Sequence, residues 1–316
     1  MIRVHQLVGT EHVVLEGAQA VARSGFAGPR WIEVFAPDTE EKAALTLYLG
    51  LHELSIEDAE REGHPPKFED FGEYLFIIVR TPLDASTTTT RKIAVIFTKT
   101  DVVTVLRAAM PALDEISRKV ARQPKRFLAS TEVFLHAVLD QTIHGFDALA
   151  DQLIDRVAEI EDAALKSPQP DVLTQILETR SDVAPLSQMV RQQREVCLAI
   201  LRSEHSALTK KIRPYLRDVY DHCLRVTDMF ERVREGIAAA RDAYHSTVNK
   251  RLSEIMRTLT VLTTMMMPLT VISSIFGMNF SDLPGSASPW GFWAAVAAMC
   301  GLAAVMLAWF RRREWI

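Results

Sequence analysis

Two long stretches without any charged residue lie near the C-terminus of this 316-residue chain. The first runs from Thr258 to Ser281 and the second from Leu283 to Phe310, with Asp282 alone between them. Each is longer than the roughly 20 residues that a helix needs to cross a bilayer. Charged residues are frequent before position 257. The sequence therefore predicts a large polar region joined to a hairpin of two membrane helices.

Basic residues flank the hairpin. Lys250 and Arg257 precede the first stretch, and Arg311, Arg312 and Arg313 form a basic ring after the second. Because cationic residues collect on the cytoplasmic side, both ends of the hairpin are expected in the cytoplasm. No cationic segment followed by an apolar core opens the chain, so no signal peptide is expected. We therefore expect a multi-pass protein of the bacterial inner membrane, with both termini cytoplasmic.

The step in composition suggests how the chain is organised. We expect a cytoplasmic α/β domain over residues 1–130 and long cytoplasmic helices over residues 131–257, the last of which forms a stalk. The rest is divided into a pore-lining membrane helix (258–280), an external loop (281–289), a second membrane helix (290–310) and a basic tail (311–316).

Local patterns support this division. A helix ended by Gly50 is predicted over residues 39–49. Short segments rich in Ile, Val and Phe predict strands over residues 12–15, 30–35, 74–80, 92–97 and 102–106.

Three long helices are predicted after these strands. One begins at Thr131, a second begins at a cap on Asp171, and a third begins near Pro214 because proline suits a first helical turn. No cluster of glycine or proline separates the third helix from the first membrane stretch. We therefore expect one continuous helix from Pro214 to Phe276, about 95 Å long at 1.5 Å per residue.

Two periodic patterns share this long helix. Apolar or small residues recur every three or four positions, as in a coiled-coil seam, at Leu216, Val219, Cys223, Val226, Phe230, Val233, Ile237, Ala240 and Tyr244. Acidic residues recur every seven positions on another side, at Asp221, Asp228, Glu235 and Asp242. The acidic column is either an ordinary solvated face or, if the seam packs on outer helices, a stack of carboxylate rings that concentrates cations in an oligomer.

A third pattern continues into the first membrane stretch. Hydroxyl and flexible apolar side chains alternate at helical spacing, at Ser253, Met256, Leu259, Thr263, Met267 and Thr270. This stripe fits either ordinary helix packing in a membrane or the lining of a pore with a hydrophobic gate. One hairpin cannot enclose a water-filled path, so a pore requires an oligomer. The second membrane helix has tryptophan at both ends and is expected to face lipid.

The membrane helices carry no acid or base with which to strip water from an ion. That composition suits an ion that crosses hydrated, and magnesium holds its water unusually tightly. Gly277, Met278 and Asn279 follow the first helix. A ring of Asn279 amides and Gly277 carbonyls is able to hold the outer water shell of such an ion.

These residues resemble the CorA family of magnesium and divalent-cation transporters. The resemblance rests on Met267–Thr270, on Phe276–Phe280 with its Gly-Met-Asn motif, on the second span and on the basic tail. It extends upstream and so covers nearly the whole chain. The matching segments there are Trp31–Val34, Leu51–Asp58, Phe68–Val79 and the stalk segment Arg217–His222.

The resemblance implies a funnel-shaped homopentamer that carries Mg²⁺, and also Co²⁺, through five stalk helices. Gly277, Met278 and Asn279 would form the selectivity filter, and Met256, Leu259 and Met267 the gate. Asp218 matches one ligand of a regulatory Mg²⁺ site between neighbouring subunits, and Asp84 is the nearest match to the other. Asp242 matches an acidic ring near the cytoplasmic end of the pore.

Two alternatives stay open. Ser253 stands where many relatives have asparagine, and the loop after the motif resembles the zinc-transporting ZntB branch of the superfamily. That branch implies proton-coupled Zn²⁺ transport instead of a Mg²⁺ channel. A hairpin that only anchors an oligomeric sensor or scaffold is the alternative from another class.

Other functions are disfavoured by the sequence. No basic patch interleaved with aromatic residues predicts nucleic-acid binding. No nucleophile, phosphate-binding loop or ordered acid–base pair predicts an enzyme. His52, His64 and His222 lie far apart in the sequence without a partner at ligand spacing, so we expect surface or packing roles for them.

Overall fold

The computed structural model describes residues 1–9, 11–22, 28–84, 86–278, 288, 290–313 and 315. The chain forms two compact units, residues 1–241 and residues 242–316. The long helix α8 (Arg213–Phe276) contributes to both.

The first unit is built on a seven-stranded mixed sheet with the order β2-β1-β3-β7-β6-β5-β4. β3 and β7 pair in parallel, and the other neighbours pair antiparallel. The strands are β1 (Ile2–Val8), β2 (Glu11–Glu16), β3 (Arg30–Phe35), β4 (Lys67–Asp70), β5 (Leu75–Pro82), β6 (Thr90–Phe97) and β7 (Asp101–Leu106). The strands predicted from the sequence correspond to β2, β3, β5, β6 and β7.

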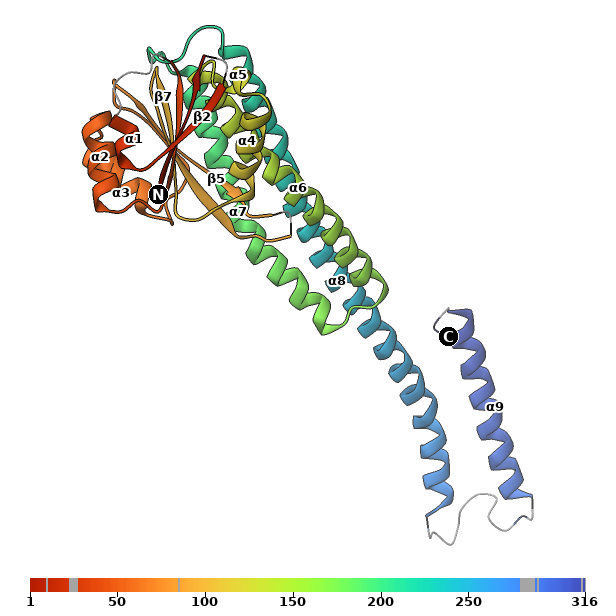
Figure 1. Cartoon of the computed structure of the whole chain (residues 1–316). Coiled ribbons are helices and arrows are strands. Elements are labelled where there is room, and N and C mark those ends of the chain that lie inside the picture. Colours follow the sequence, from red (N-terminus) through yellow and green to blue (C-terminus); the bar gives the residue numbers. More distant parts are fainter. Residues whose placement is uncertain are drawn as a thin grey trace. The chain divides into compact units, whose positions relative to one another are not determined.

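Helices cover both faces of this sheet (Figure 1). One face packs on α1 (Ala18–Ala22), α2 (Thr39–Leu49) and α3 (Glu53–Glu60). The other face packs on the long helices α6 (Thr131–Lys166) and α7 (Pro170–Arg202), beside which lie α4 (Pro111–Arg122) and α5 (Pro124–Phe127).

Two neighbouring residues of β3 pack into separate hydrophobic layers on the two faces of the sheet. The Trp31 ring packs on Phe134 of α6 with centroids 4.6 Å apart, whereas Ile32 joins the cluster that contains Leu45 of α2. Because both faces are covered, the central strands are buried along their whole length and have nearly continuous apolar sequences.

The ends of α2 lie where local sequence signals predict them, whereas the start of α7 differs from its prediction. α2 begins with a reciprocal capping box between Asp38 and Glu41 and ends at Gly50, whose φ of 62° is left-handed. The expectation that Asp171 caps α7 is wrong. The cap position is Gln169, and Pro170 is the first helical residue. Proline fits there because its missing N–H has no helical partner to lose.

The continuous helix is confirmed as α8, a single helix of 64 residues. Its apolar seam is buried from Leu216 to Ala240 and packs on the outer helices α6 and α7. Phe230 meets Phe146 of α6 with ring centroids 6.2 Å apart, and Cys223 Sγ lies 3.4 Å from Cys197 Sγ of α7. The seam therefore leaves the acidic side of the helix uncovered in the single chain.

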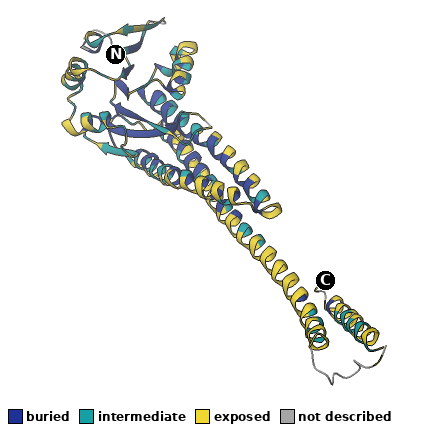
Figure 2. Cartoon of the chain, turned by 90° about the horizontal axis from the view of Figure 1, so that it is seen from below, coloured by how far each residue is buried: buried dark blue, intermediate teal, exposed yellow. Residues whose placement is uncertain are grey.

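The second unit contains the remainder of α8 and the helix α9 (Gly291–Arg312). Most of its described side chains are exposed, as the yellow surface of these helices shows in Figure 2. α8 and α9 each include a stretch long and apolar enough to cross a membrane.

Candidate ion path and cytoplasmic metal centre

The predicted pore stripe lies on an exposed face of α8. All six of its residues are exposed in the single chain, namely Ser253, Met256, Leu259, Thr263, Met267 and Thr270. Thr263, Met267 and Thr270 also line one shallow groove, which continues along the helix past Ser274 to Met278. The helical spacing inferred from the sequence therefore places these side chains on a common surface.

The threonine hydroxyls of this stripe donate their hydrogen bonds to backbone carbonyls of the same helix. Thr263 Oγ1 donates to the carbonyl of Leu259 at 2.8 Å, and Thr270 Oγ1 donates to the carbonyl of Met266 at 2.9 Å. Each hydroxyl oxygen is left with lone pairs that accept hydrogen bonds. The stripe thus presents acceptors, which match the hydrogen atoms on the water shell of a cation.

The C-terminal end of α8 lies just before the Gly-Met-Asn motif, at Phe276. The Gly277 amide donates to the carbonyls of Ser273 at 3.0 Å and Ser274 at 3.2 Å, and the exposed Met278 follows it. Asn279 lies outside the described residues, as do loop residues 280–287.

α9 has the surface expected of a lipid-facing helix. Trp290, Trp293 and Trp309 are exposed near its two ends. Arg313, which follows the equally exposed Arg311 and Arg312, places its guanidinium 5.7 Å from the centre of the Trp309 ring. Aromatic and cationic groups together are typical of a membrane–water interface.

The acidic column occupies the side of α8 away from its buried seam. Its four members are exposed, three of them in the first unit and one in the second, namely Asp221, Asp228, Glu235 and Asp242.

The two carboxylates assigned to a regulatory site are both exposed. Asp84 Oδ1 accepts bonds from the Ser86 amide at 2.7 Å and the Ser86 hydroxyl at 2.6 Å. These bonds, the hydroxyl first, hold the pKa of Asp84 below its ordinary value. Asp218 lies on α8, near the half-buried imidazole of His136. Burial lowers the pKa of His136, while the negative charges of Asp140 and Asp218 act in the opposite direction.

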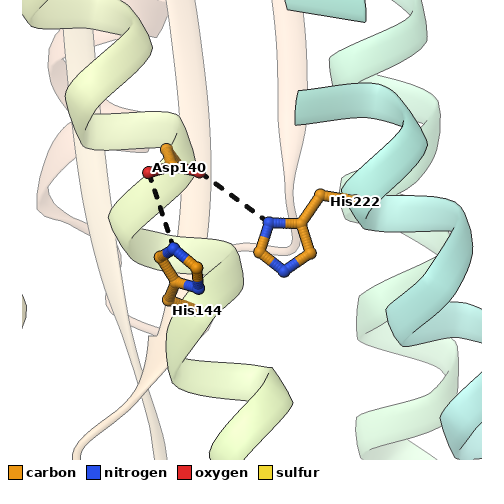
Figure 3. Close-up of side chains that lie close together, drawn as sticks. All are labelled: Asp140, His144 and His222. Carbon is orange, nitrogen blue, oxygen red and sulfur yellow. Dashed lines mark ion pairs between the residues drawn. The ribbon is translucent and has the colours of Figure 1, made fainter. Parts of the chain in front are cut away.

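His222 is buried, as the predicted packing role requires, but it has neighbours that its sequence spacing did not reveal. The packing of α8 on α6 brings it next to Asp140 and His144 (Figure 3). Asp147 of α6 also contacts its imidazole. Single-sequence reasoning missed this cluster because its parts lie on two helices separated by a third. One signal was available, since Asp140 and His144 are four residues apart on a predicted helix and therefore share a face.

Comparison with known proteins identifies the chain. A family model described as "CorA-like Mg2+ transporter protein" matches residues 26–312. The cobalt/magnesium transport protein CorA of Thermotoga maritima is 25% identical over 294 residues, which cover 91% of this chain and 84% of that protein. The zinc transport protein ZntB of Cronobacter sakazakii is 24% identical over 183 residues, 55% of either chain.

A solved structure has the same fold over the whole length. The complete structure of the CorA magnesium transporter from Methanocaldococcus jannaschii superposes with a TM-score of 0.86 at 24% identity, covering 100% of this chain and 99% of that one. The resemblance read from the Gly-Met-Asn motif is thereby confirmed. The chain belongs to the family of CorA-like Mg²⁺ transporter proteins, and it is a divalent-cation transporter of the CorA superfamily, not an enzyme.

Proposed function

We propose that the chain forms a homopentameric Mg²⁺ channel in the bacterial inner membrane, with α8 around the ion path and α9 against lipid. The observation that carries this proposal is the exposed stripe on α8, which combines hydroxyl acceptors with flexible apolar side chains. A single hairpin cannot surround water, so the stripe becomes a lining only when several copies assemble.

The chemistry of the stripe favours a hydrated ion. The membrane part of α8 has no carboxylate that would replace the water of a cation. Magnesium gives up its inner water reluctantly, and its bound waters point their hydrogens outward. Oxygen atoms that only accept, such as those of Thr263 and Thr270, suit that shell.

Selection and gating are assigned to the two kinds of residue along this path. Gly277, Met278 and Asn279 form the outer filter that holds the hydrated ion. Met256, Leu259 and Met267 narrow the path at a hydrophobic gate, which closes by expelling water. Ser253, at the inner end, replaces a longer amide with a hydroxyl and sets how tightly the water shell is held there.

The cytoplasmic part gathers and senses the ion. Stacked copies of Asp221, Asp228, Glu235 and Asp242 concentrate cations at the inner mouth. Asp218 of one subunit and Asp84 of its neighbour bind Mg²⁺ when its internal concentration is high and hold the assembly closed. Both carboxylates are exposed in the single chain, so a neighbouring copy is able to reach them.

A proton-coupled Zn²⁺ transporter is the second candidate. It is favoured by the similarity to a zinc transport protein and by the loop after the motif, which has Asp282 as its single acid.

Uptake into proteoliposomes separates these functions. We expect Mg²⁺ flux, and Co²⁺ flux beside it, that follows the membrane potential and ignores a proton gradient. Zn²⁺ flux that rises with an inward proton gradient, without Mg²⁺ flux, would replace the channel by the zinc transporter. If no divalent cation crossed, the hairpin would be only the anchor of an oligomeric scaffold.

A further inference from the structure

A compact group of two imidazoles and two carboxylates lies between α6 and α8 in the first unit. Asp140, His144 and Asp147 are on α6 at positions i, i+4 and i+7, so they line one face of that helix. His222 enters from α8 and is buried. Dashed lines in Figure 3 join the Asp140 carboxylate to both imidazole rings.

The polar atoms of this group converge. His144 Nε2 lies 3.7 Å from Asp140 Oδ2, and His222 Nδ1 lies 3.8 Å from Asp140 Oδ1. Asp147 Oδ2 is 3.2 Å from His144 Nδ1 and in direct contact with His222 Nε2. One ligand atom each from Asp140, His144 and His222 lies within 4.8 Å of the others.

That spacing is close to what a small cation needs. Ligand atoms held about 2.0–2.2 Å from a tetrahedral zinc ion are roughly 3.3 Å from one another. A contraction of about 1.5 Å at the widest pair of ligand atoms would therefore complete the site. The imidazole rings of His144 and His222 already pack edge to face, with their centroids 4.8 Å apart. His144 and both carboxylates are partly open to water, which gives an ion a way in.

The donor set decides which cation fits. Two imidazole nitrogens with carboxylate oxygens suit zinc and cobalt, whereas magnesium prefers oxygen ligands and keeps most of its water. We propose that Asp140, His144 and His222 form a binding site for a zinc-class transition-metal ion within one subunit. Asp147, which contacts the ring nitrogens that do not face Asp140, would accept hydrogen bonds from them and orient both imidazoles. This site is separate from the ion path and from the carboxylate pair of Asp218 and Asp84, and its occupancy needs no transport.

Metal binding to the full-length protein in detergent tests the proposal. After chelator treatment, we expect about one Zn²⁺ per chain to bind in competition with a chromophoric chelator, and a large excess of Mg²⁺ to leave it bound. Co²⁺ in its place should give the intense visible absorption of a four-coordinate ion. His144→Gln and His222→Gln should each weaken Zn²⁺ binding by at least about tenfold, a loss that even outer-shell changes can cause.

The controls make the result decisive. His144 is exposed, so its replacement does not threaten folding even if that of His222 does. His245→Gln removes another exposed histidine from α8 and should leave binding unchanged. Asn279→Ala should block transport but leave Zn²⁺ binding unchanged. The proposed metal site and the proposed ion path can therefore be tested separately. Zn²⁺ binding that is absent, or that survives His144→Gln at full affinity, would show that the group is only an ion-pair cluster.

Discussion

The two units of the molecule use apolar side chains in opposite ways. In the first unit the large ones are buried, with Trp31, Phe76 and Phe97 at zero exposure. In the second unit Met267, Phe292 and Trp290 are 69%, 68% and 75% exposed. Exposed apolar surface on this scale marks a contact with lipid or with protein. The first unit thus completes its core from its own sequence, whereas the second leaves apolar side chains that lipid or protein has to cover.

The two units also differ in their polar groups. The first unit buries charges and gives them partners, such as Arg30, whose Nε lies 2.7 Å from Asp101 Oδ1. The membrane stretches carry no charge at all, and their described threonine hydroxyls bond to their own helix. Substitutions should therefore act on the stability of the first unit but on the transport of the second.

The largest effect is expected where the second unit meets the ion. Asn279→Ala removes the amide that is proposed to hold the hydrated cation, so divalent-cation uptake into proteoliposomes should fall below detection. The oligomer should remain intact on size-exclusion chromatography, because the substitution takes away only a polar amide group. Uptake that persisted at the level of the unchanged protein would contradict the filter assignment.

The sequence alone predicted those features of the structure that depend on local signals. The long helix and its seam were predictable, because proline placement and three-and-four spacing are local signals. The strand Lys67–Asp70 was missed because it has only four residues and lies at the edge of the sheet, where little pattern develops. The strand Ile2–Val8 was missed for another reason, since the buried polar residues His5 and Gln6 interrupt its apolar pattern. The group around His222 was missed for a different reason: tertiary packing alone brings α6 and α8 together.

A change at the cytoplasmic carboxylates should have the next largest effect. Asp218→Lys places a cation where Mg²⁺ is proposed to bind between subunits, so internal Mg²⁺ should no longer inhibit uptake. The measurement is initial uptake into proteoliposomes loaded with increasing Mg²⁺. Asp171→Lys is the matched control, because Asp171 is an exposed carboxylate in the first turn of α7. Inhibition that is unchanged in Asp218→Lys would remove this residue from the regulatory site.

Within the first unit, replacement of the buried Lys92 should cause a large loss of stability. Its Nζ donates to the carbonyls of Asp58, Ala59 and Arg61 at 2.7–2.9 Å, at the C-terminal end of α3. Burial lowers the pKa of this amine to about 8. Lys92→Met should lower the free energy of unfolding by about 3 kcal/mol, because it leaves buried acceptors without a donor.

Hydrogen exchange of the full-length protein measures this loss in peptides from α3 and β6. Lys166→Met is the control, since Lys166 forms an exposed ion pair with Asp162 and such pairs contribute about 0.5 kcal/mol or less. Equal effects of the two substitutions would show that the Lys92 contacts contribute little.

Two helical glycines test the comparison of the units most directly. Gly145 of α6 lies against β5, where an added Cβ would come within 2.5 Å of Thr81 Oγ1 and 3.2 Å of Pro82 Cδ. Gly301 of α9 has no atom within 4 Å of such a position among the described residues. Alanine favours a helix by about 1 kcal/mol over glycine, but overpacking a tight contact costs about 1–3 kcal/mol.

Gly145→Ala should therefore destabilise the first unit by about 1 kcal/mol, since the cost of the tight contact exceeds the gain in helix propensity. Hydrogen exchange in α6 and β5 would report it. Gly301→Ala should leave exchange in the first unit and cation uptake unchanged if that face of α9 meets only lipid. Loss of uptake in Gly301→Ala would instead reveal a close contact with a neighbouring copy. The surface of α9 around this glycine would then pack against a neighbouring copy. In that case α9 would contact protein on one side and lipid on another.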